Sequence, residues 1–137
     1  MPSKPFSAGA VIVYPYRWAS EAAEGRSVDG AKERPCCLVT RLLDQSLLLL
    51  AISSKPPAED QEAIEIPPIE RRRAGLGKYP QAWIYIGESN RDADIGVSWY
   101  LEPQKPMGSF SPAFLTTIKQ AFRASVAKGG SVVSRQS

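Results

Sequence analysis

Proline and glycine are scattered along the whole chain, and they limit its secondary structure more than any other feature. The 137 residues include 12 prolines and 10 glycines. A proline inside a helix removes a backbone hydrogen bond, and a glycine adds backbone freedom that folding must remove. The sequence therefore predicts short strands and helices joined by turns. They would form one domain, since ordinary domains hold about 100–150 residues.

Apolar runs bounded by turn residues predict a series of β-strands. The longer runs cover residues 9–16, 35–43, 46–53 and 82–86. The run 46–53 is almost entirely apolar, so we expect a strand that is buried on both faces. Residues 63–66 alternate and would add a short edge strand, and residues 99–101 would add a last short one. The polar residues 87–94 form a segment just beyond the strand 82–86.

Two helices are expected, one short and one long. Residues 67–76 combine a proline at the start, three arginines and a glycine near the end, which fits a short helix. Ser111 and Pro112 suit the cap and first position of a longer helix, which Gly129 would end. The long segment 17–33 is expected to be a loop, and long loops are often functional.

These elements together predict a mainly β (α+β) fold. Five to seven short strands would close into a small barrel, with the short arginine-bearing helix and a C-terminal helix laid across it. The domain would span residues 9–128, and residues 129–137 would form a flexible tail.

The composition excludes several kinds of chemistry. The sequence contains no histidine, which removes imidazole acid–base pairs, Ser-His-Asp triads and histidine-based zinc sites. The two cysteines, Cys36 and Cys37, are adjacent in one predicted strand and point to opposite faces, so we expect free thiols in a reducing compartment. We expect no metal, no cofactor and no membrane span, and hence a cytoplasmic protein.

Three polar clusters lie where predicted strands meet loops: Lys32–Pro35, Ser53–Lys55 and Glu88–Arg91. In the first, Pro35 fixes the backbone beside Arg34, whose guanidinium could clamp a phosphate. The hydroxyls and ammonium of the second could bind an oxyanion, although serines there commonly cap turns. The carboxylate and guanidinium of the third could act as an acid–base pair or neutralise each other. Each cluster could equally be an ordinary charged surface.

The arginine triplet Arg71–Arg73 is a stronger concentration of charge, in a chain whose net charge is only +3. Consecutive helical residues spread around the helix, so the three cannot all touch one ligand. The triplet is either a solvated helix surface or a rim that attracts phosphates. Aromatic residues offer base-stacking platforms, although Tyr14 and Trp83, which lie within strands, suit a core or an interface better.

The order of these clusters resembles the MazF/PemK toxin family. The resemblance covers roughly residues 9–126. It rests on Arg34-Pro35 leading into a strand, Ser53-Ser54 closing the next, the extended Ala63–Ile66, the acidic Glu88 followed by Arg91, and a final helix. It is closest to longer-looped PemK-like growth inhibitors. The family opens on Gly-Asp where this chain has Gly9-Ala10, and Ser53 and Ser89 replace its usual Thr and Gln.

The resemblance implies an SH3-like barrel, a homodimer, and metal-independent cleavage of single-stranded RNA at the dimer interface. It also implies neutralisation by a small antitoxin protein. In such chemistry the ribose 2′-hydroxyl attacks the adjacent phosphorus. Arg34 would stabilise the transition-state charge, Ser53 would donate to the phosphate, and Glu88 would act as the base or orient Arg34. Further RNA contacts would come from Ser54, Lys55, Arg91, Lys32 and Glu21, with Glu21 and Glu24 as alternative carboxylates.

Two alternatives use the same barrel without catalysis. One is a binding module that grips a protein, as the related gyrase-poisoning toxins do, with Trp99 and the C-terminal helix as the contact surface. The other is an RNA-binding relative that does not cleave.

Overall fold

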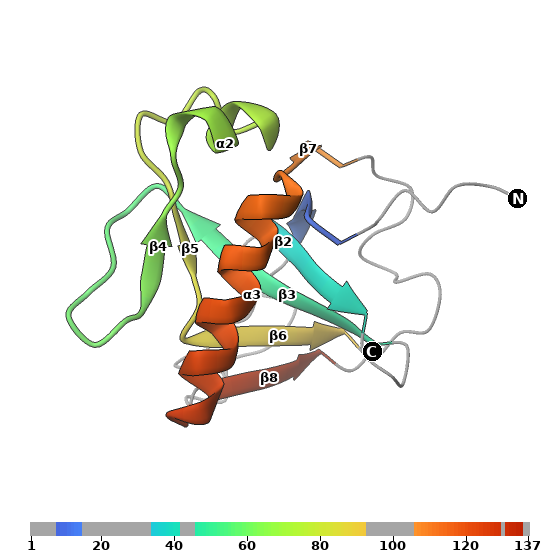
Figure 1. The fold of residues 1–137 in the computed structure, drawn as a ribbon, viewed down its shortest axis with the longest axis vertical. Coiled ribbons are helices and arrows are strands. Elements are labelled where there is room, and N and C mark those ends of the chain that lie inside the picture. Colours follow the sequence, from blue (N-terminus) through green and yellow to red (C-terminus); the bar gives the residue numbers. More distant parts are fainter. Residues whose placement is uncertain (1–7, 15–33, 42–45, 93–105, 130, 136–137) are drawn as a thin grey trace, which may run out of the picture.

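The computed structural model describes residues 8–14, 34–41, 46–92, 106–129 and 131–135. These residues form a mainly β fold, a curled sheet with one short and one long helix (Figure 1). The strands are β1 (Ala10–Tyr14), β2 (Arg34–Arg41), β3 (Leu47–Ser53), β4 (Ala63–Glu65), β5 (Trp83–Tyr85), β6 (Glu88–Asp92), β7 (Gly108–Ser109) and β8 (Ser131–Arg135), and the helices are α2 (Pro68–Arg73) and α3 (Pro112–Ala127).

The main path of the sheet is antiparallel and runs in the order β4-β5-β3-β2-β1-β7. The polar strand β6 pairs with the first half of β3, and β8 adds to β6 in parallel. The result is a half-barrel, as expected for a small α+β barrel. The expected edge position of the strand within 63–66 is confirmed, because β4 ends the path. None of the helices in the described part of the chain is long and apolar enough to cross a membrane.

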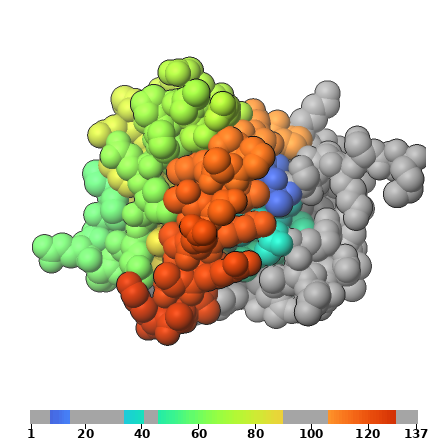
Figure 2. All heavy atoms as spheres, viewed as in Figure 1, coloured from blue at the N-terminus to red at the C-terminus, as the bar shows by residue number. Residues whose placement is uncertain are grey.

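The two faces of the sheet bury different sets of side chains. Successive strand residues point to opposite faces, and β3 is buried along its length up to Ser53, which confirms that both of its faces are covered. One face packs against α3 (Figures 1 and 2) through a cluster that includes Cys37, Leu50 and Ile118. The opposite face carries a second cluster: Ile12, Tyr14, Cys36, Leu38, Leu47, Leu49 and Ala51.

The helix α3 begins as the sequence predicts. The Ser111 hydroxyl accepts a hydrogen bond from the backbone N–H of Phe114 at 3.2 Å, and Pro112 occupies the first turn. Three apolar residues spaced four apart, Phe114, Ile118 and Phe122, bury one side of the helix in the core. Gly129 follows the end of the helix with φ +101°, a conformation that favours glycine.

The helix α2 is shorter than predicted, and its end packs tightly against β7. Gly75 follows it with φ +77°. A Cβ atom on Gly108 would lie 2.2 Å from the carbonyl oxygen of Arg73, far inside van der Waals contact. Glycine at 108 therefore lets the backbone of β7 approach the last turn of α2.

Two segments differ from the expectation. The polar residues after β5 form β6, and the segment expected to be a frayed tail forms β8. These two strands pair with each other, Glu88 with Ser131 through to Asp92 with Arg135. The predicted loop 17–33 and the strand predicted at 99–101 lie outside the described residues.

Candidate functional site

The sheet register brings Arg34 and Ser53 to the same level. β2 and β3 pair Cys36 with Ala51, and two steps further this antiparallel register sets Arg34, the first residue of β2, opposite Ser53, the last residue of β3. Directly opposed residues project from the same face of a sheet. Both residues line a pocket of about 230 Å³ at the strand ends, together with Pro35, Ile52, Ser54, Tyr79 and Ala82.

Ser53 uses its hydroxyl in the turn that follows β3. The oxygen accepts a hydrogen bond from the backbone N–H of Lys55 at 3.1 Å, which is the turn-capping use of serine that the sequence allows. A hydroxyl has two acceptor sites and one proton, so Ser53 can cap this turn and still donate to an oxyanion in the pocket. Ser54 and Lys55 are both exposed beside it.

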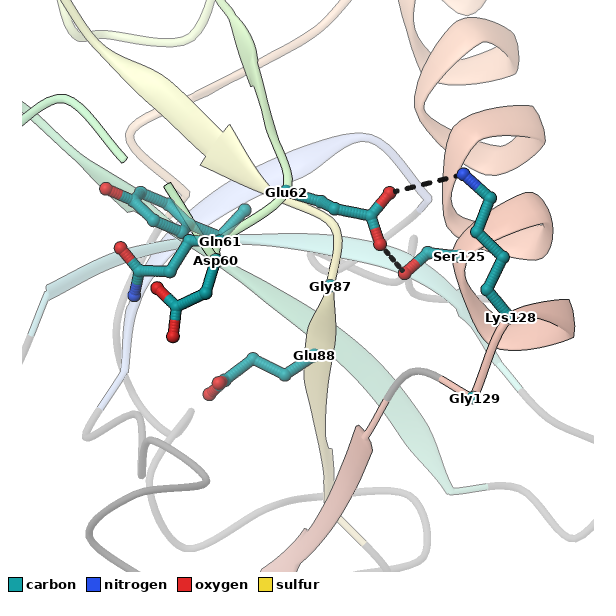
Figure 3. Close-up of a pocket in the computed structure, with 9 residues that line it drawn as sticks. Asp60, Gln61, Glu62, Gly87, Glu88, Ser125, Lys128 and Gly129 are labelled. Atoms are coloured by element: carbon teal, nitrogen blue, oxygen red, sulfur yellow. Dashed lines mark hydrogen bonds and ion pairs between the residues drawn. The ribbon is translucent and has the colours of Figure 1, made fainter. Parts of the chain in front are cut away.

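Tyr85 joins this turn to a second pocket. Its hydroxyl donates to the carbonyl oxygen of Lys55 at 2.9 Å. Burial raises the pKa of the Tyr85 phenol above its usual value, so the hydroxyl keeps its proton at neutral pH and remains a donor. The ring also lines a second pocket of about 230 Å³, which contains Glu88 (Figure 3).

The second pocket contains three carboxylates and one ammonium group. Besides Tyr85 and Glu88 it is lined by Asp60, Gln61, Glu62, Gly87, Ser125, Lys128 and Gly129. Glu62 is directed to the end of α3, where its carboxylate accepts from the Ser125 hydroxyl at 3.0 Å and lies 4.0 Å from the Lys128 ammonium (Figure 3). Glu88 points to the other side of this pocket in the same view.

The structure thus assembles part of the predicted site. Arg34, Ser53 and Ser54 share one pocket, and Glu88 lines a different one. Glu21, Glu24 and Lys32 lie outside the described residues. Arg91 lies in β6, and its side chain is outside the described part of the chain.

The arginine triplet has three different environments. Arg71 donates to the carbonyl oxygen of Ile66 at 3.0 Å, and Arg73 pairs with the buried Glu70 at 2.9 Å. Arg72 is exposed. Two of the three arginines therefore make contacts that stabilise α2. Arg72 makes no such contact with the described residues and faces solvent.

Neither cysteine offers reactive chemistry. As the sequence predicts, neither Cys36 nor Cys37 forms a disulfide, and both thiols are buried. Burial raises the pKa of the Cys37 thiol to about 12, although nearby Lys119 opposes the shift. No group of three or more acidic or cysteine side chains in the described segments could hold a metal ion.

No protein-family model matches the chain, and no curated protein is significantly similar to it.

Proposed function

We propose that the chain is a metal-independent endoribonuclease that cleaves single-stranded RNA and serves as the toxin of a type II toxin–antitoxin system. The observation that carries the proposal is the pocket shared by Arg34, Ser53 and Ser54. A guanidinium and two hydroxyls at one end of a sheet provide the positive charge and the donors that a phosphoryl oxygen requires. The order of the sequence clusters, from Arg34-Pro35 to the final helix, supports the same class.

The proposed reaction takes its nucleophile from the substrate. The ribose 2′-hydroxyl gives its proton to a base as its oxygen attacks the adjacent phosphorus, the bond from phosphorus to the 5′-oxygen of the next nucleotide breaks, and the departing oxygen takes up a proton from water. The products are a 2′,3′-cyclic phosphate and a 5′-hydroxyl end. Arg34 stabilises the charge on the phosphoryl oxygens, and the Ser53 hydroxyl donates to one of them.

Glu88 is the proposed base for the 2′-hydroxyl. Leu49 pairs with Asn90. Continuing this antiparallel register by two residues brings Glu88 opposite Ala51, which lies two residues before Ser53. RNA bound at the Arg34 pocket would have to extend past Tyr85 to reach Glu88. A Glu88→Gln variant that binds RNA normally and cleaves slowly would support this role. Full activity of that variant would show that Glu88 is not the base.

The function is tested by incubating the purified protein with a long single-stranded RNA in excess chelator. We expect fragments with 5′-hydroxyl and cyclic phosphate ends, and far slower formation of the same fragments by an Arg34→Ala preparation purified in parallel, which controls for contaminating nucleases. RNA binding without cleavage would favour the RNA-binding relative, and neither binding nor cleavage would favour the protein-binding module.

The toxin role has its own test in cells. Expression should arrest growth, and co-expression of a small acidic protein encoded immediately upstream should restore it. We also expect a homodimer, because a symmetric pair is the commonest way to cover exposed apolar and aromatic surface. Sedimentation at micromolar concentration giving the monomer mass of 15.0 kDa would contradict the dimer.

A further inference from the structure

One row of side chains crosses four neighbouring strands on the sheet face opposite α3. β3 pairs Ser53 with Trp83, and β4 pairs Glu65 with the same Trp83. Ser53 is in turn level with Arg34 through the β2–β3 register. Among the next residues along these strands, Ile84 pairs with both Ile52 and Ile64. Ile52 and Ile84 belong to the cluster under α3, and Ile64 packs against it. Arg34, Ser53, Trp83 and Glu65 therefore project from the opposite face, in that order.

The members of this row are close enough to serve one ligand. Paired strands lie about 4.8 Å apart, so the row from Arg34 to Glu65 spans about 14 Å. Its first two residues border the pocket at the strand ends. An RNA strand whose phosphate occupies that pocket can therefore place a base against Trp83 on the neighbouring strand β5.

Trp83 and Glu65 have no structural task that the described residues reveal. Trp83 is half-buried and Glu65 is exposed, whereas the neighbouring Tyr85 is buried and hydrogen-bonded to Lys55. Within the described segments neither the Trp83 side chain nor the Glu65 side chain has a hydrogen-bond, ion-pair or ring partner. Among the described residues, the half-buried Trp83 indole and the exposed Glu65 carboxylate are thus neighbours on this face of the sheet with no side-chain partner.

We propose that Trp83 and Glu65 form a subsite for one unpaired nucleobase, next to the phosphate pocket of Arg34 and Ser53. This inference rests on the proposed binding of single-stranded RNA. The indole stacks on the face of the base, as aromatic side chains on exposed sheets do in other single-strand binders. The Glu65 carboxylate accepts hydrogen bonds from the Watson–Crick edge of the same base.

The carboxylate makes the subsite selective for guanine. An ionised carboxylate only accepts hydrogen bonds. Guanine offers it two adjacent donors, N1–H and the N2 amino group. Adenine and cytosine each place a ring nitrogen acceptor beside their amino group, and uracil flanks its single N3–H with two carbonyl oxygens. These acceptors would face a negative charge, so the three other bases bind less well.

The subsite is tested with short RNA analogues that cannot be cleaved. Fluorescently labelled heptamers with 2′-O-methyl sugars, all uridine or with a central guanosine, adenosine or cytidine, are titrated with the full chain and followed by anisotropy. We expect the guanosine heptamer to bind the wild type most tightly. Trp83→Leu, which keeps apolar volume but has no aromatic face, should weaken binding of every heptamer by about 5- to 150-fold.

Matched variants separate stacking from folding and from general charge. Trp83→Phe keeps a ring and should lose less affinity than Trp83→Leu. Glu65→Ala should abolish the preference for guanosine. Glu59→Ala, which removes another exposed carboxylate, from the turn after β3, should keep that preference.

Wild-type affinity in Trp83→Leu, or an unchanged guanosine preference in Glu65→Ala, would overturn the subsite even if the protein cleaves RNA. If the heptamers bind as expected but long RNA stays intact, the proposed ribonuclease activity fails and the subsite stands. If the wild type binds no heptamer, the subsite is overturned, and the row would then suit a protein contact better.

Discussion

Glu70 in α2 accepts two hydrogen bonds from Ser111, the cap of α3: one from the backbone N–H at 2.9 Å and one from the hydroxyl at 2.7 Å. The same hydroxyl accepts from the N–H of Phe114. Glu70 is only 6% exposed. A single buried carboxylate therefore joins the two helices and orients the residue that begins α3.

Loss of the Glu70 carboxylate should destabilise the fold. Glu70→Ala leaves the Ser111 N–H without an acceptor and should lower the free energy of unfolding by about 1–3 kcal/mol. Chemical denaturation of both proteins measures the difference. A neighbouring exposed residue gives the control: Ile69→Ala, at 49% exposure, should change stability much less. Equal losses in the two variants would contradict a special role for Glu70.

The same carboxylate should make stability depend on pH. Burial raises the pKa of Glu70, but hydrogen bonds from Ser111 and the charge and hydrogen bond of Arg73 outweigh burial, so the pKa falls below its ordinary value of 4.5. The folded state then binds the proton more weakly than the unfolded state. The stabilisation is complete above about pH 4.5 and is lost as the pH falls through the lower folded-state value. Glu70→Gln should flatten this part of the pH–stability curve, and an unchanged curve would show that other carboxyls cause it.

A side chain at position 108, in place of Gly108, should destabilise the fold. Its Cβ would lie within 3 Å of the Ala74 backbone as well as 2.2 Å from the Arg73 oxygen, so Gly108→Ala must move α2 away from β7. We expect a loss of about 1–3 kcal/mol, the usual cost of overpacking. Gly77→Ala is the matched control, because its Cβ would meet only Arg72 Cγ at 3.8 Å. Thermal unfolding of the two variants tests this, and equal melting temperatures would refute the close approach.

The two thiols should be unreactive in the folded protein. Cys36 and Cys37 are buried, and the Cys37 pKa of about 12 leaves almost no thiolate at pH 8, the form that reacts. A thiol-specific disulfide reagent should therefore label neither cysteine in the native state and both in denaturant. Rapid labelling of one native thiol would contradict the burial. Cys36→Ser and Cys37→Ser variants that fold should retain their function.

The sequence allows most of the main sheet and both helices to be predicted, because their signals are local. The apolar run of β3 and the Ser111-Pro112 start of α3 each specify their own structure. The strands β6 and β8 lack a clear alternation of apolar and polar residues. β6 joins the sheet through β3, and β8 joins it through β6, so neither strand is evident from its own residues. The two-residue β7 depends on its pairing with β1.

The candidate site could be predicted only where strands adjacent in sequence meet. Arg34 and Ser53 come together because β2 and β3, which the sequence predicts as consecutive strands, pair in antiparallel register. Glu88 lies in another pocket because the chain changes direction at Ile86 and Gly87. There the Ile86 N–H donates to the backbone carbonyl oxygen of Glu62, and β6 follows β5 beside β3. The Trp83–Glu65 pair depends on the register of β5 against β3 and β4, which no local pattern specifies.

The arginine on the exposed side of α2 should attract RNA without contributing to cleavage. Arg72→Ala should weaken RNA binding and lower the salt slope by about 0.7 for each phosphate that the variant no longer neutralises. Arg71 and Arg73 are unsuitable for this test because each makes a hydrogen bond that stabilises α2. Binding titrations between low and moderate salt give the slope. An unchanged slope would mean that α2 lies away from the RNA.

The central claim is that Arg34 acts on the phosphate during cleavage, and single-turnover cleavage of a long RNA in excess chelator tests it most directly. Wild type should cleave, Arg34→Ala should cleave about 10²-fold more slowly or worse, and Arg72→Ala should reach the wild-type rate at saturating protein. Arg34→Lys, which keeps the charge but not the planar fork, should fall between, provided that thermal unfolding shows all variants folded. The claim would be contradicted if wild type leaves the RNA intact, or if Arg72→Ala loses the rate and Arg34→Ala keeps it.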